Sequence, residues 1–389
     1  MARFALFVII VPLFMLFLGS LRLLAQELVW NEEGVIFSDP TIHNVEVIPL
    51  PDGRYRMYFA KQVATEQSED STSKPNAIYS AISTDARNFQ IESGVRLTGS
   101  MPAIVKLPDG KWRMYFASPS GETSSAEGGA SFATNVIKSA ISSDGLSWLI
   151  EKGIRLSPGG EFDPDNIVHP TVVALPQGGY RMYYDGEVRR TEQEFTWRIL
   201  SATSTDGLIW AKDPGVRINV NEGPLDADLV WSAHAEYYNL TDTYQLYFSV
   251  QTPIDNLIDG IYSATSEDGL LFTVEAKPEL APAKESGESG IGGQVGSYQD
   301  PFILELTEGK IMYYWINGSG IYSARLGKNS LEPEPQTIWE TLKQKPAELW
   351  EKLKKIELPE NFELYIIPTI LLITGAAAVF YLWRSRIRR

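Results

Sequence analysis

The sequence predicts an all-β protein, a five-bladed β-propeller that is closed by its own N-terminal strand. Three observations support this fold class. One strand-like motif occurs five times along the chain, a second motif follows each copy, and a segment near the N-terminus matches the strand that the last repeat lacks. Self-similarity of this kind is the sequence signature of a repeat architecture.

The first motif is a half-apolar run that returns with a period of about 65 residues. Its copies are "YRMYFA" at 55–60, "WRMYFA" at 112–117, "YRMYYD" at 180–185, "YQLYFS" at 244–249 and "KIMYYW" at 310–315. Tyrosine, phenylalanine and tryptophan are frequent in strands, so each copy predicts one strand of a repeated sheet.

Two further motifs keep step with the first. The second reads "IYSAISTD" at 78–85, "IKSAISSD" at 137–144, "ILSATSTD" at 199–206, "IYSATSED" at 261–268 and a shortened "IYSARL" at 321–326. The third reads "SGVRL" at 93–97, "KGIRL" at 152–156, "PGVRI" at 214–218 and a degraded "AKPEL" at 276–280. With the apolar run that opens each unit, they predict a four-stranded antiparallel sheet per repeat.

The turns between these strands carry recognisable residues. "LPDG" stands at 50–53 and again at 107–110, and "SSDGLSW" at 142–148 has close copies in the later repeats. Asp and Gly favour tight turns because Asp bonds nearby backbone and Gly accepts positive φ. We therefore interpret these aspartates as structural.

The fifth repeat stops after its third strand, and the chain offers a replacement. "LVWNEEGVIF" at 28–37 matches "LIWAKDPGVRI" at 208–218 in its Leu, its Trp and its Gly-Val pair. We expect Trp30 to Phe37 to form the outer strand of the last blade. This would close the ring and remove an exposed sheet edge.

The ends of the chain predict export and anchoring. The expected parts are a signal peptide at 1–25, the propeller at 26–327, a stalk with short amphipathic helices at 328–363, a transmembrane helix at 364–383 and a basic cytoplasmic tail at 384–389. Arg22 lies close to the expected cleavage point, so an uncleaved signal anchor is the alternative. The stalk helices have two open placements, against the ring or at the membrane interface.

Composition is consistent with an exported propeller. Aromatic residues make up 11% of the chain and its net charge is −15, which argues against nucleic acid as a partner. The chain has no Cys, so no disulfide stabilises the fold. We expect a monomeric single-pass protein of the cell membrane with the ring outside.

The three histidines of the chain suggest a site on the propeller axis. His43, His169 and His234 all lie near the start of an innermost strand, in blades 1, 3 and 4. The long polar loops fall on the same face, and we expect the three side chains to meet there beside Asp39 and Asp300. Imidazole and carboxylate groups bind first-row divalent metals, and carboxylates can hold Ca²⁺ partly through water. The alternative is that they fill and hydrate the channel.

Carboxylates are frequent around these strand entrances. The loops "GEFDPDNIVHP" and "GPLDADLVWSA" each contain an Asp-x-Asp pair, at Asp163 and Asp165 and at Asp226 and Asp228. Paired carboxylates can act as general acid and base.

The strand entrances "SDPTI" at 38–42, "VHPTVV" at 168–173 and "QDPFIL" at 299–304 resemble those of a known group. Followed by the repeated motifs, they look like five-bladed propellers of the arabinanase, levansucrase and invertase type, including glycoside hydrolase family 43. The resemblance implies an Asp base in blade 1, a pKa-tuning Asp in blade 3 and a Glu acid in blade 4. It suggests Asp39 as base. The tuning residue would be Asp163 or Asp165, and the acid Glu236 or Glu187.

Two functions remain open at this stage. The first is a surface glycosidase that uses paired carboxylates, and the second is a non-catalytic propeller that binds glycans or a surface protein. Carboxylates about 5–10 Å apart across an open pocket would favour the enzyme. A pocket with one carboxylate, or one closed by aromatic rings, would favour the binding protein.

Overall fold

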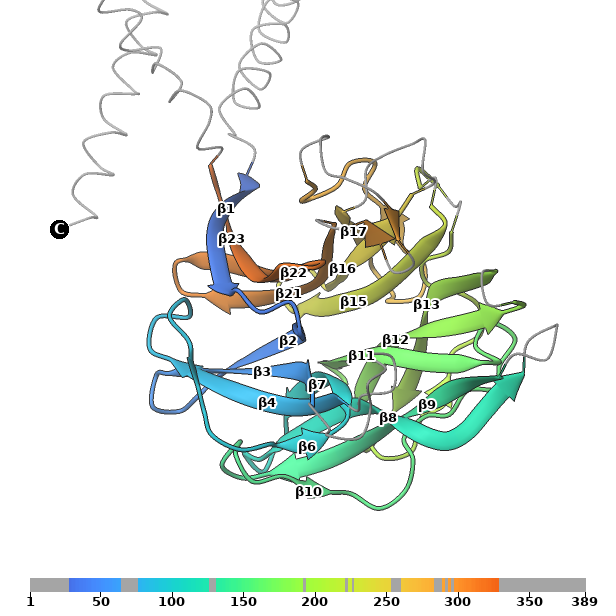
Figure 1. The fold of residues 1–389 in the computed structure, drawn as a ribbon, viewed down its shortest axis with the longest axis horizontal. Coiled ribbons are helices and arrows are strands. Elements are labelled where there is room, and N and C mark those ends of the chain that lie inside the picture. The colour runs from blue at the N-terminus through green and yellow to red at the C-terminus, as the bar shows by residue number, and fades with distance from the viewer. Residues whose placement is uncertain are drawn as a thin grey trace, which may run out of the picture. The chain divides into compact units, whose positions relative to one another are not determined.

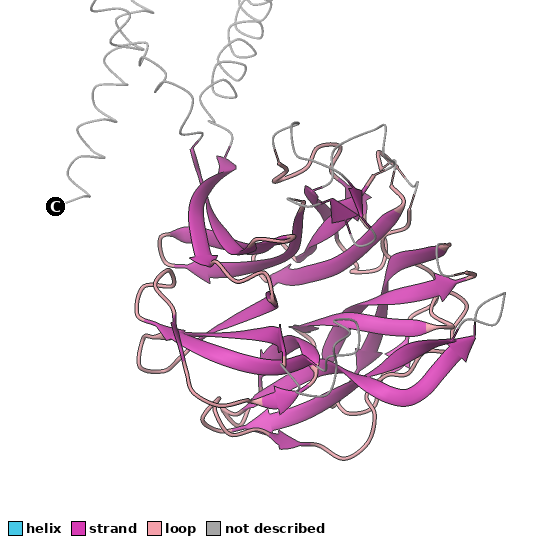
Figure 2. Cartoon of the chain, in the orientation of Figure 1, coloured by secondary structure: helices cyan, strands magenta, loops and turns pink. Residues whose placement is uncertain are grey.

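The structure is a computed structural model, and it describes residues 28–63, 76–125, 131–191, 194–220, 223–225, 227–252, 260–282, 289–290, 293–294 and 297–328. The predicted signal peptide, stalk, transmembrane helix and tail lie outside these ranges. Every regular element in the described ranges is a strand (Figure 2). None of the described residues belongs to a helix with the length and apolarity needed to span a membrane.

The strands form five blades that follow one another along the chain (Figure 1). Blade 1 contains β2 (Ile42–Pro49), β3 (Tyr55–Gln62), β4 (Asn76–Ser83) and β5 (Gln90–Ile91), and β6 (Leu97–Thr98) also pairs with β4. Blade 2 contains β7 (Ser100–Lys106), β8 (Trp112–Ser125), β9 (Ser131–Ser142) and β10 (Leu149–Ile150). Blade 3 contains β11 (Asn166–Ala174), β12 (Tyr180–Arg189), β13 (Phe195–Ser204) and β14 (Ala211–Lys212).

The last two blades complete the ring. Blade 4 contains β15 (Leu229–Tyr238), β16 (Thr243–Gln251), β17 (Gly260–Ser266) and β18 (Thr273–Val274). Blade 5 contains β21 (Tyr298–Leu306), β22 (Gly309–Ile316), β23 (Gly320–Lys328) and β1 (Leu28–Phe37). Between these blades, β19 (Ser289–Gly290) and β20 (Gly293–Gln294) form a short separate hairpin.

The N-terminal strand closes the ring as predicted. β1 lies antiparallel to β23, with Cα pairing that runs from Leu28 opposite Lys328 to Phe37 opposite Ile321 (Figure 1). Trp30 is buried, and its ring meets the ring of Tyr247 in blade 4 edge-on, with 6.1 Å between centroids. The first strand therefore supplies the outer strand that the fifth repeat lacks.

Tyrosines of the first repeated motif clasp each blade to the next one. Their buried hydroxyls donate to backbone carbonyls in the turn before the outermost strand of the neighbouring blade. These bonds are Tyr58 to Gly145 (2.6 Å), Tyr115 to Gly207 (2.8 Å), Tyr183 to Gly269 (3.0 Å) and Tyr313 to Ala86 (2.5 Å). The turn aspartates hold these turns in shape, since Asp144 accepts two backbone N–H bonds at 2.8 Å.

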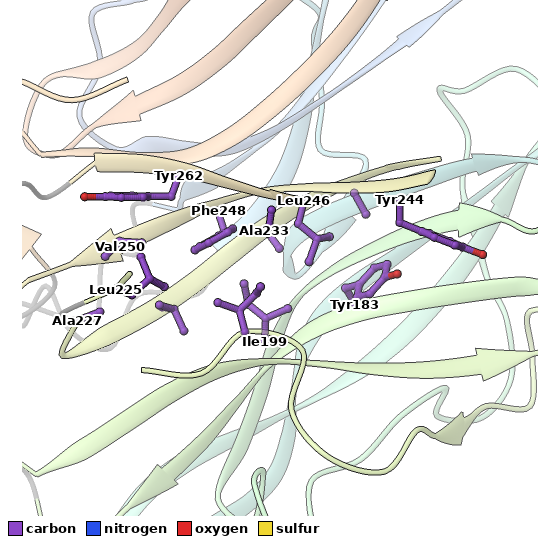
Figure 3. Packing of buried hydrophobic residues seen from close by; sticks show 14 of the residues in the cluster. Tyr183, Ile199, Leu225, Ala227, Ala233, Tyr244, Leu246, Phe248, Val250 and Tyr262 are labelled. Atoms are coloured by element: carbon purple, nitrogen blue, oxygen red, sulfur yellow. The ribbon is translucent and has the colours of Figure 1, made fainter. Parts of the chain in front are cut away.

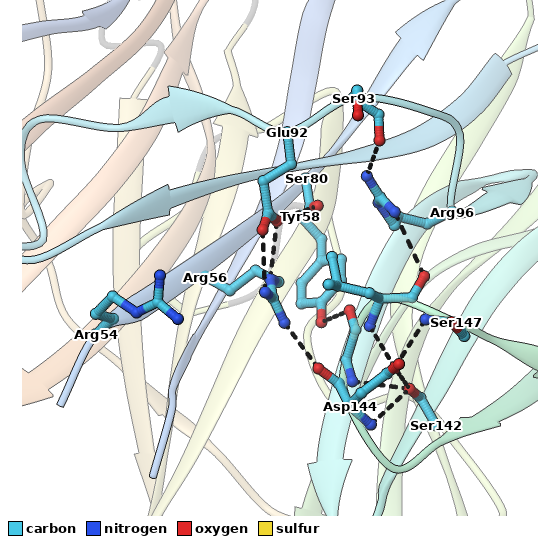
Figure 4. A network of polar contacts seen from close by, with 12 residues as sticks. Arg54, Arg56, Tyr58, Ser80, Glu92, Ser93, Arg96, Ser142, Asp144 and Ser147 are labelled. Carbon is cyan, nitrogen blue, oxygen red and sulfur yellow. Dashed lines mark hydrogen bonds and ion pairs between the residues drawn. The ribbon is translucent and has the colours of Figure 1, made fainter. Parts of the chain in front are cut away.

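Arginines strengthen three of these clasps, the third through Arg181, which donates to the carbonyl of Asp268 at 2.5 Å. Arg56 donates to both carboxylate oxygens of Glu92, at 2.8 and 3.0 Å, and to the carbonyl of Asp144 in the next blade at 2.9 Å (Figure 4). Arg113 makes the equivalent set of bonds with Glu151 and the carbonyl of Asp206. Both guanidinium groups are largely buried, so these bonds are shielded from solvent.

Apolar side chains fill the layers between the blades. Figure 3 shows the cluster between blades 3 and 4, where Tyr183 and Ile199 of blade 3 lie beneath Leu246 and Phe248 of blade 4. Alternate side chains of a strand face opposite sides, so each blade packs against both of its neighbours.

The innermost strands share one unusual backbone feature. Each has a bulge in its pairing with the second strand, and at that bulge one residue adopts a left-handed conformation. We call these five residues the axial ring: Asn44 (φ 51°), Met101 (φ 56°), His169 (φ 47°), Ser232 (φ 52°) and Asp300 (φ 53°). Non-glycine residues rarely adopt this conformation, and where they do it often marks a functional site.

Candidate functional site

A cavity of about 700 Å³ opens on the axis above the axial ring. It lies on the face where the second and third strands of each blade connect. The sequence predicts the site on this face because the long polar loops fall there. Its lining is rich in amides and aromatic rings: Gln62, Asn135, Asn166, Gln251, Gln299, Asn317, Phe195, Trp197, Trp231 and Trp315. The volume suits a small organic ligand.

His169 occupies the floor of this cavity between two carboxylates. Its Nδ1 lies 2.6 Å from Oδ2 of Asp185, and its Nε2 lies 3.9 Å from Oδ1 of Asp300. The backbone N–H of Ser232 donates to the same Oδ2 of Asp185 at 2.8 Å. Asp185 is completely buried, so these two bonds fix it and the imidazole together.

The electrostatics of this group follow from its burial and its charges. Burial opposes the charged form of His169, but Asp185 and then Asp300 outweigh that effect and raise the pKa of the imidazole. A carboxylate on either side thus favours the protonated ring, with both nitrogens as donors.

Asp300 is held from two directions. Its Oδ2 accepts a bond from Nδ2 of Asn44 at 2.8 Å, and its backbone N–H donates to Oγ of Ser249 at 3.0 Å. Asn44 Oδ1 in turn is bonded to Nδ1 of His43. Polar side chains therefore cross the floor from Asp185 to His43, through three of the five blades, with one gap of 3.9 Å between His169 and Asp300.

Three buried polar atoms on the cavity wall have no hydrogen-bond partner among the described residues. They are Oδ1 of Asp185, Oε1 of Gln251 and Nε1 of Trp315. Leaving a buried polar atom unpaired costs roughly 1–3 kcal/mol, so such atoms usually meet a ligand or water. Two of the three accept hydrogen bonds and one donates.

A second polar level lies beneath the axial ring. Glu46 and His234 each stand two residues beyond the ring position of their strand, and both line a space of about 40 Å³ there. Oε1 of Glu46 accepts the backbone N–H of Ile104 at 3.1 Å, and burial raises the pKa of Glu46 to about 8. The ring of His234 packs against Phe302 at 4.5 Å between centroids, and burial lowers its pKa to about 3.

The three histidines thus stand at different depths on the axis. His43 precedes its axial-ring position by one residue, His169 occupies that position, and His234 follows it by two. At ~3.3 Å of rise per residue, these offsets separate His234 from the upper pair. The described residues contain no group of three His, Asp or Glu side chains suited to a metal ion, and the metal stays a prediction.

The predicted equivalence of the three strand entrances is wrong for blade 1. The bulges align Asn44–Val45 with His169–Pro170 and Asp300–Pro301, whereas Asp39 comes five residues before Asn44. The side chain of Asp39 is about one-third exposed. Hydrogen bonds from Lys61 and Thr41 lower its pKa to about 2.

The Asp-x-Asp loop lies away from the cavity. Asp163 is buried at the outer side of blade 3, where Lys212 and the hydroxyl of Tyr184 contact its Oδ2 at 2.5 and 3.0 Å. Asp165 accepts the backbone N–H of Arg189 at 2.7 Å. In the matching loop Asp228 is exposed, and Asp226 lies outside the described residues.

The two candidate acids also lie off the cavity surface. Glu187 is buried behind the wall and pairs with Arg189, whose guanidinium stacks on Phe132 and Phe195 at 4.4 and 4.5 Å. Glu236 pairs with Lys310 at 2.9 Å. Neither Glu is among the residues that line the cavity.

Sequence reasoning missed Asp185, although the repeats contained a signal. It is the last residue of the third copy of the first motif, where the other copies have Ala60, Ala117, Ser249 and Trp315. In the structure each of these residues pairs with the residue before its axial-ring position. A charged residue at a position otherwise occupied by small or aromatic side chains was the available clue.

Comparison with known proteins yields similarity of fold. No family model and no curated protein matches this chain. Among solved structures, a glycoside hydrolase is 15% identical with a TM-score of 0.56, and the match covers 79% of this chain and 95% of that one. The shared fold is the five-bladed propeller.

Two further matches have the same character. A glycosyl hydrolase from Bacteroides ovatus is 15% identical with a TM-score of 0.53, covering 77% of this chain and 88% of its own. A thermostable family-43 glycoside hydrolase is 13% identical with a TM-score of 0.54, covering 76% and 95%. The predicted resemblance to propellers of glycoside hydrolases is confirmed at the level of fold.

Proposed function

We propose that the propeller binds a carbohydrate in the axial cavity and does not cleave it with paired carboxylates. The observation that carries this proposal is the set of unpaired buried atoms on the wall. Two acceptors, Asp185 Oδ1 and Gln251 Oε1, require donors from the ligand, and Trp315 Nε1 requires an acceptor. A hydroxyl group both donates and accepts, so a sugar satisfies all three.

The aromatic lining supports the same class of ligand. Trp197 and Trp231 present indole rings to the cavity beside amide side chains such as Asn166. Indole is a large apolar surface that suits the C–H face of a sugar ring, and amides bond its hydroxyls. Matches to glycoside hydrolases of the same fold are consistent with a sugar ligand, by analogy alone.

The arrangement of the carboxylates favours binding over hydrolysis. In the glycosidase mechanism two carboxyl groups face each other across the scissile bond. Here the imidazole of His169 stands between Asp185 and Asp300, and Oδ2 of Asp185 is held by that imidazole and by the backbone N–H of Ser232. The axial-ring positions of blades 1 and 4, where the resembled family would have its base and its acid, hold Asn44 and Ser232.

A glycan array probed with the full-length protein tests the proposal. We expect retention of a restricted set of glycans, and loss of that retention in Trp231→Ala. The matched control is Leu271→Ala, a side chain 79% exposed on the outer turn of blade 4, which should bind as wild type does. Release of nitrophenol from aryl glycosides, abolished by Asp300→Asn, would overturn the non-hydrolytic part.

We further propose that the ring is displayed outside the cell on a C-terminal membrane anchor. The support is the uncharged stretch 364–383 followed by the basic residues of 384–389. Protease treatment of intact cells should release the ring and spare a C-terminal tag. Cleavage of that tag from outside would reverse the orientation.

A further inference from the structure

The gap between His169 and Asp300 has a particular size. Nε2 and Oδ1 are 3.9 Å apart, which is too far for a direct hydrogen bond. An oxygen atom placed about 2.8 Å from both would see them at an angle of roughly 90°, which a hydroxyl group can accommodate. The gap therefore fits one bridging oxygen.

The partners of both residues leave these two atoms directed at the gap. Nδ1 of His169 is occupied by Asp185, and Oδ2 of Asp300 is occupied by Asn44. Nε2 thus remains as the second donor of the imidazole, and Oδ1 remains as an acceptor of the carboxylate. One hydroxyl group accepts from the first and donates to the second.

The backbone indicates that this geometry is maintained at a cost. Both residues adopt the left-handed conformation, with φ of 47° at His169 and 53° at Asp300, in the absence of glycine. Each such residue costs of the order of one hydrogen bond, so the surroundings must hold it in place. Oγ of Ser249 helps to hold Asp300 by accepting a hydrogen bond from the backbone N–H of Asp300.

We propose that His169 and Asp300 form a clamp for a single sugar hydroxyl, with Nε2 of His169 donating to it and Oδ1 of Asp300 accepting from it. This inference rests on the proposed function and adds to it the hydroxyl group on which recognition depends. Of the other ionisable groups on the cavity wall, Asp185 holds the opposite nitrogen of His169, and His43 and Arg189 lie outside the clamp. Its ligand is a sugar that presents a free hydroxyl to the floor.

A deoxy scan tests the clamp. Binding of methyl glycosides of D-mannose, D-galactose and L-arabinose to the full-length protein is measured by calorimetry, together with their monodeoxy derivatives. For the sugar that binds, we expect one deoxy position to weaken affinity roughly ten- to hundredfold, the range for a charge-assisted hydrogen bond. In His169→Gln and Asp300→Asn that discrimination should shrink to a few-fold at the same position.

Controls separate the clamp from its alternatives. His234→Gln alters a histidine below the cavity and should keep both the affinity and the discrimination. The same titration in chelator should give the same constants, and loss of binding there would mean that a metal ion bridges the two residues instead.

The two proposals fail in different ways. Equal discrimination by wild type and His169→Gln, with binding intact, overturns the clamp and leaves carbohydrate binding standing. No binding by the wild-type protein to these glycosides or to the glycan array overturns both. If His169→Gln does not fold, Asp300→Asn alone decides the outcome, because its amide oxygen keeps the bond from Asn44.

Discussion

The clasps between blades repeat the same residue at nearly every junction, whereas the axial ring repeats only its backbone conformation. At the clasps, the same tyrosine of the first motif bonds the next blade at four junctions, and Trp30 meets Tyr247 at the remaining one. At the axial ring the backbone is the same in all five blades, yet the residues are Asn, Met, His, Ser and Asp.

This difference distinguishes the residues that hold the blades together from the residues that form the polar site. Where the contact is needed at every junction, the residue recurs with its geometry. Where the geometry alone recurs, each blade brings a different side chain to one point, and a polar site is assembled from five chain segments. The clasps should therefore supply stability, and the axial groups should cost it.

Removing the strand that closes the ring should have the largest effect. Deletion of 28–37 exposes the edge of β23 and the contacts of Trp30, so we expect a loss of at least ~5 kcal/mol or failure to fold. Thermal unfolding of the full-length and truncated chains measures it. An unchanged melting temperature would mean that closure contributes little.

Glu46→Gln tests whether axial groups cost stability. In the folded protein Glu46 keeps its proton to about pH 8, whereas the unfolded chain releases it near the ordinary value of 4.5. The folded state holds more protons in this window, so wild-type stability falls as pH rises from 4.5 to 8. The variant should equal wild type near pH 4.5 and exceed it by a few kcal/mol, to order of magnitude, at pH 8. Urea titrations across this range should show the difference grow with pH, and a constant difference would contradict it.

Two arginine substitutions compare an ion pair at a clasp with an ion pair on the surface. Arg113→Ala removes a buried pair with Glu151 and a bond to the next blade, and we expect a loss of about 2 kcal/mol. Arg54→Ala removes an exposed pair with Asp52 and should leave the urea midpoint unchanged. Equal losses in the two variants would show that location between blades is irrelevant.

Asp39→Asn should have a small effect. Its pair with Lys61 is about one-third exposed, which predicts a change below about 1 kcal/mol and unaltered glycan binding. Its lowered pKa means that the pair's contribution is present above the ordinary pKa and is lost as pH falls toward 2. Loss of binding in this variant would restore Asp39 to the site.

The fold could be predicted from the sequence because its determinants repeat. Five copies of one motif gave the blade number, and the match of 28–37 to a fourth strand gave the closure, which β1 and β23 confirm. The structural role predicted for the turn aspartates is confirmed, because their hydrogen bonds are local in the chain.

The site could be predicted only in its location. Asp39 was matched by its Asp-Pro dipeptide, but the register of a strand is set by pairing, and the bulge places Asn44 in that position. The histidines lie at similar positions within their repeats, but a shift of one or two residues along a strand changes the face and the depth at which a side chain lies. Asp185 stands out only when the last residue of the first motif is compared across the five repeats.

The pairing of β1 with β23 has a consequence for synthesis on the ribosome. The strand that is made first acquires its partner only when residues 320–328 have left the exit tunnel, on the order of tens of seconds later at usual elongation rates. Until then β1 has no strand to pair with, and the finished blades end in an open edge. Nascent chains that pause before residue 320 should therefore be the ones that recruit chaperones, because the propeller cannot close until β23 has been made.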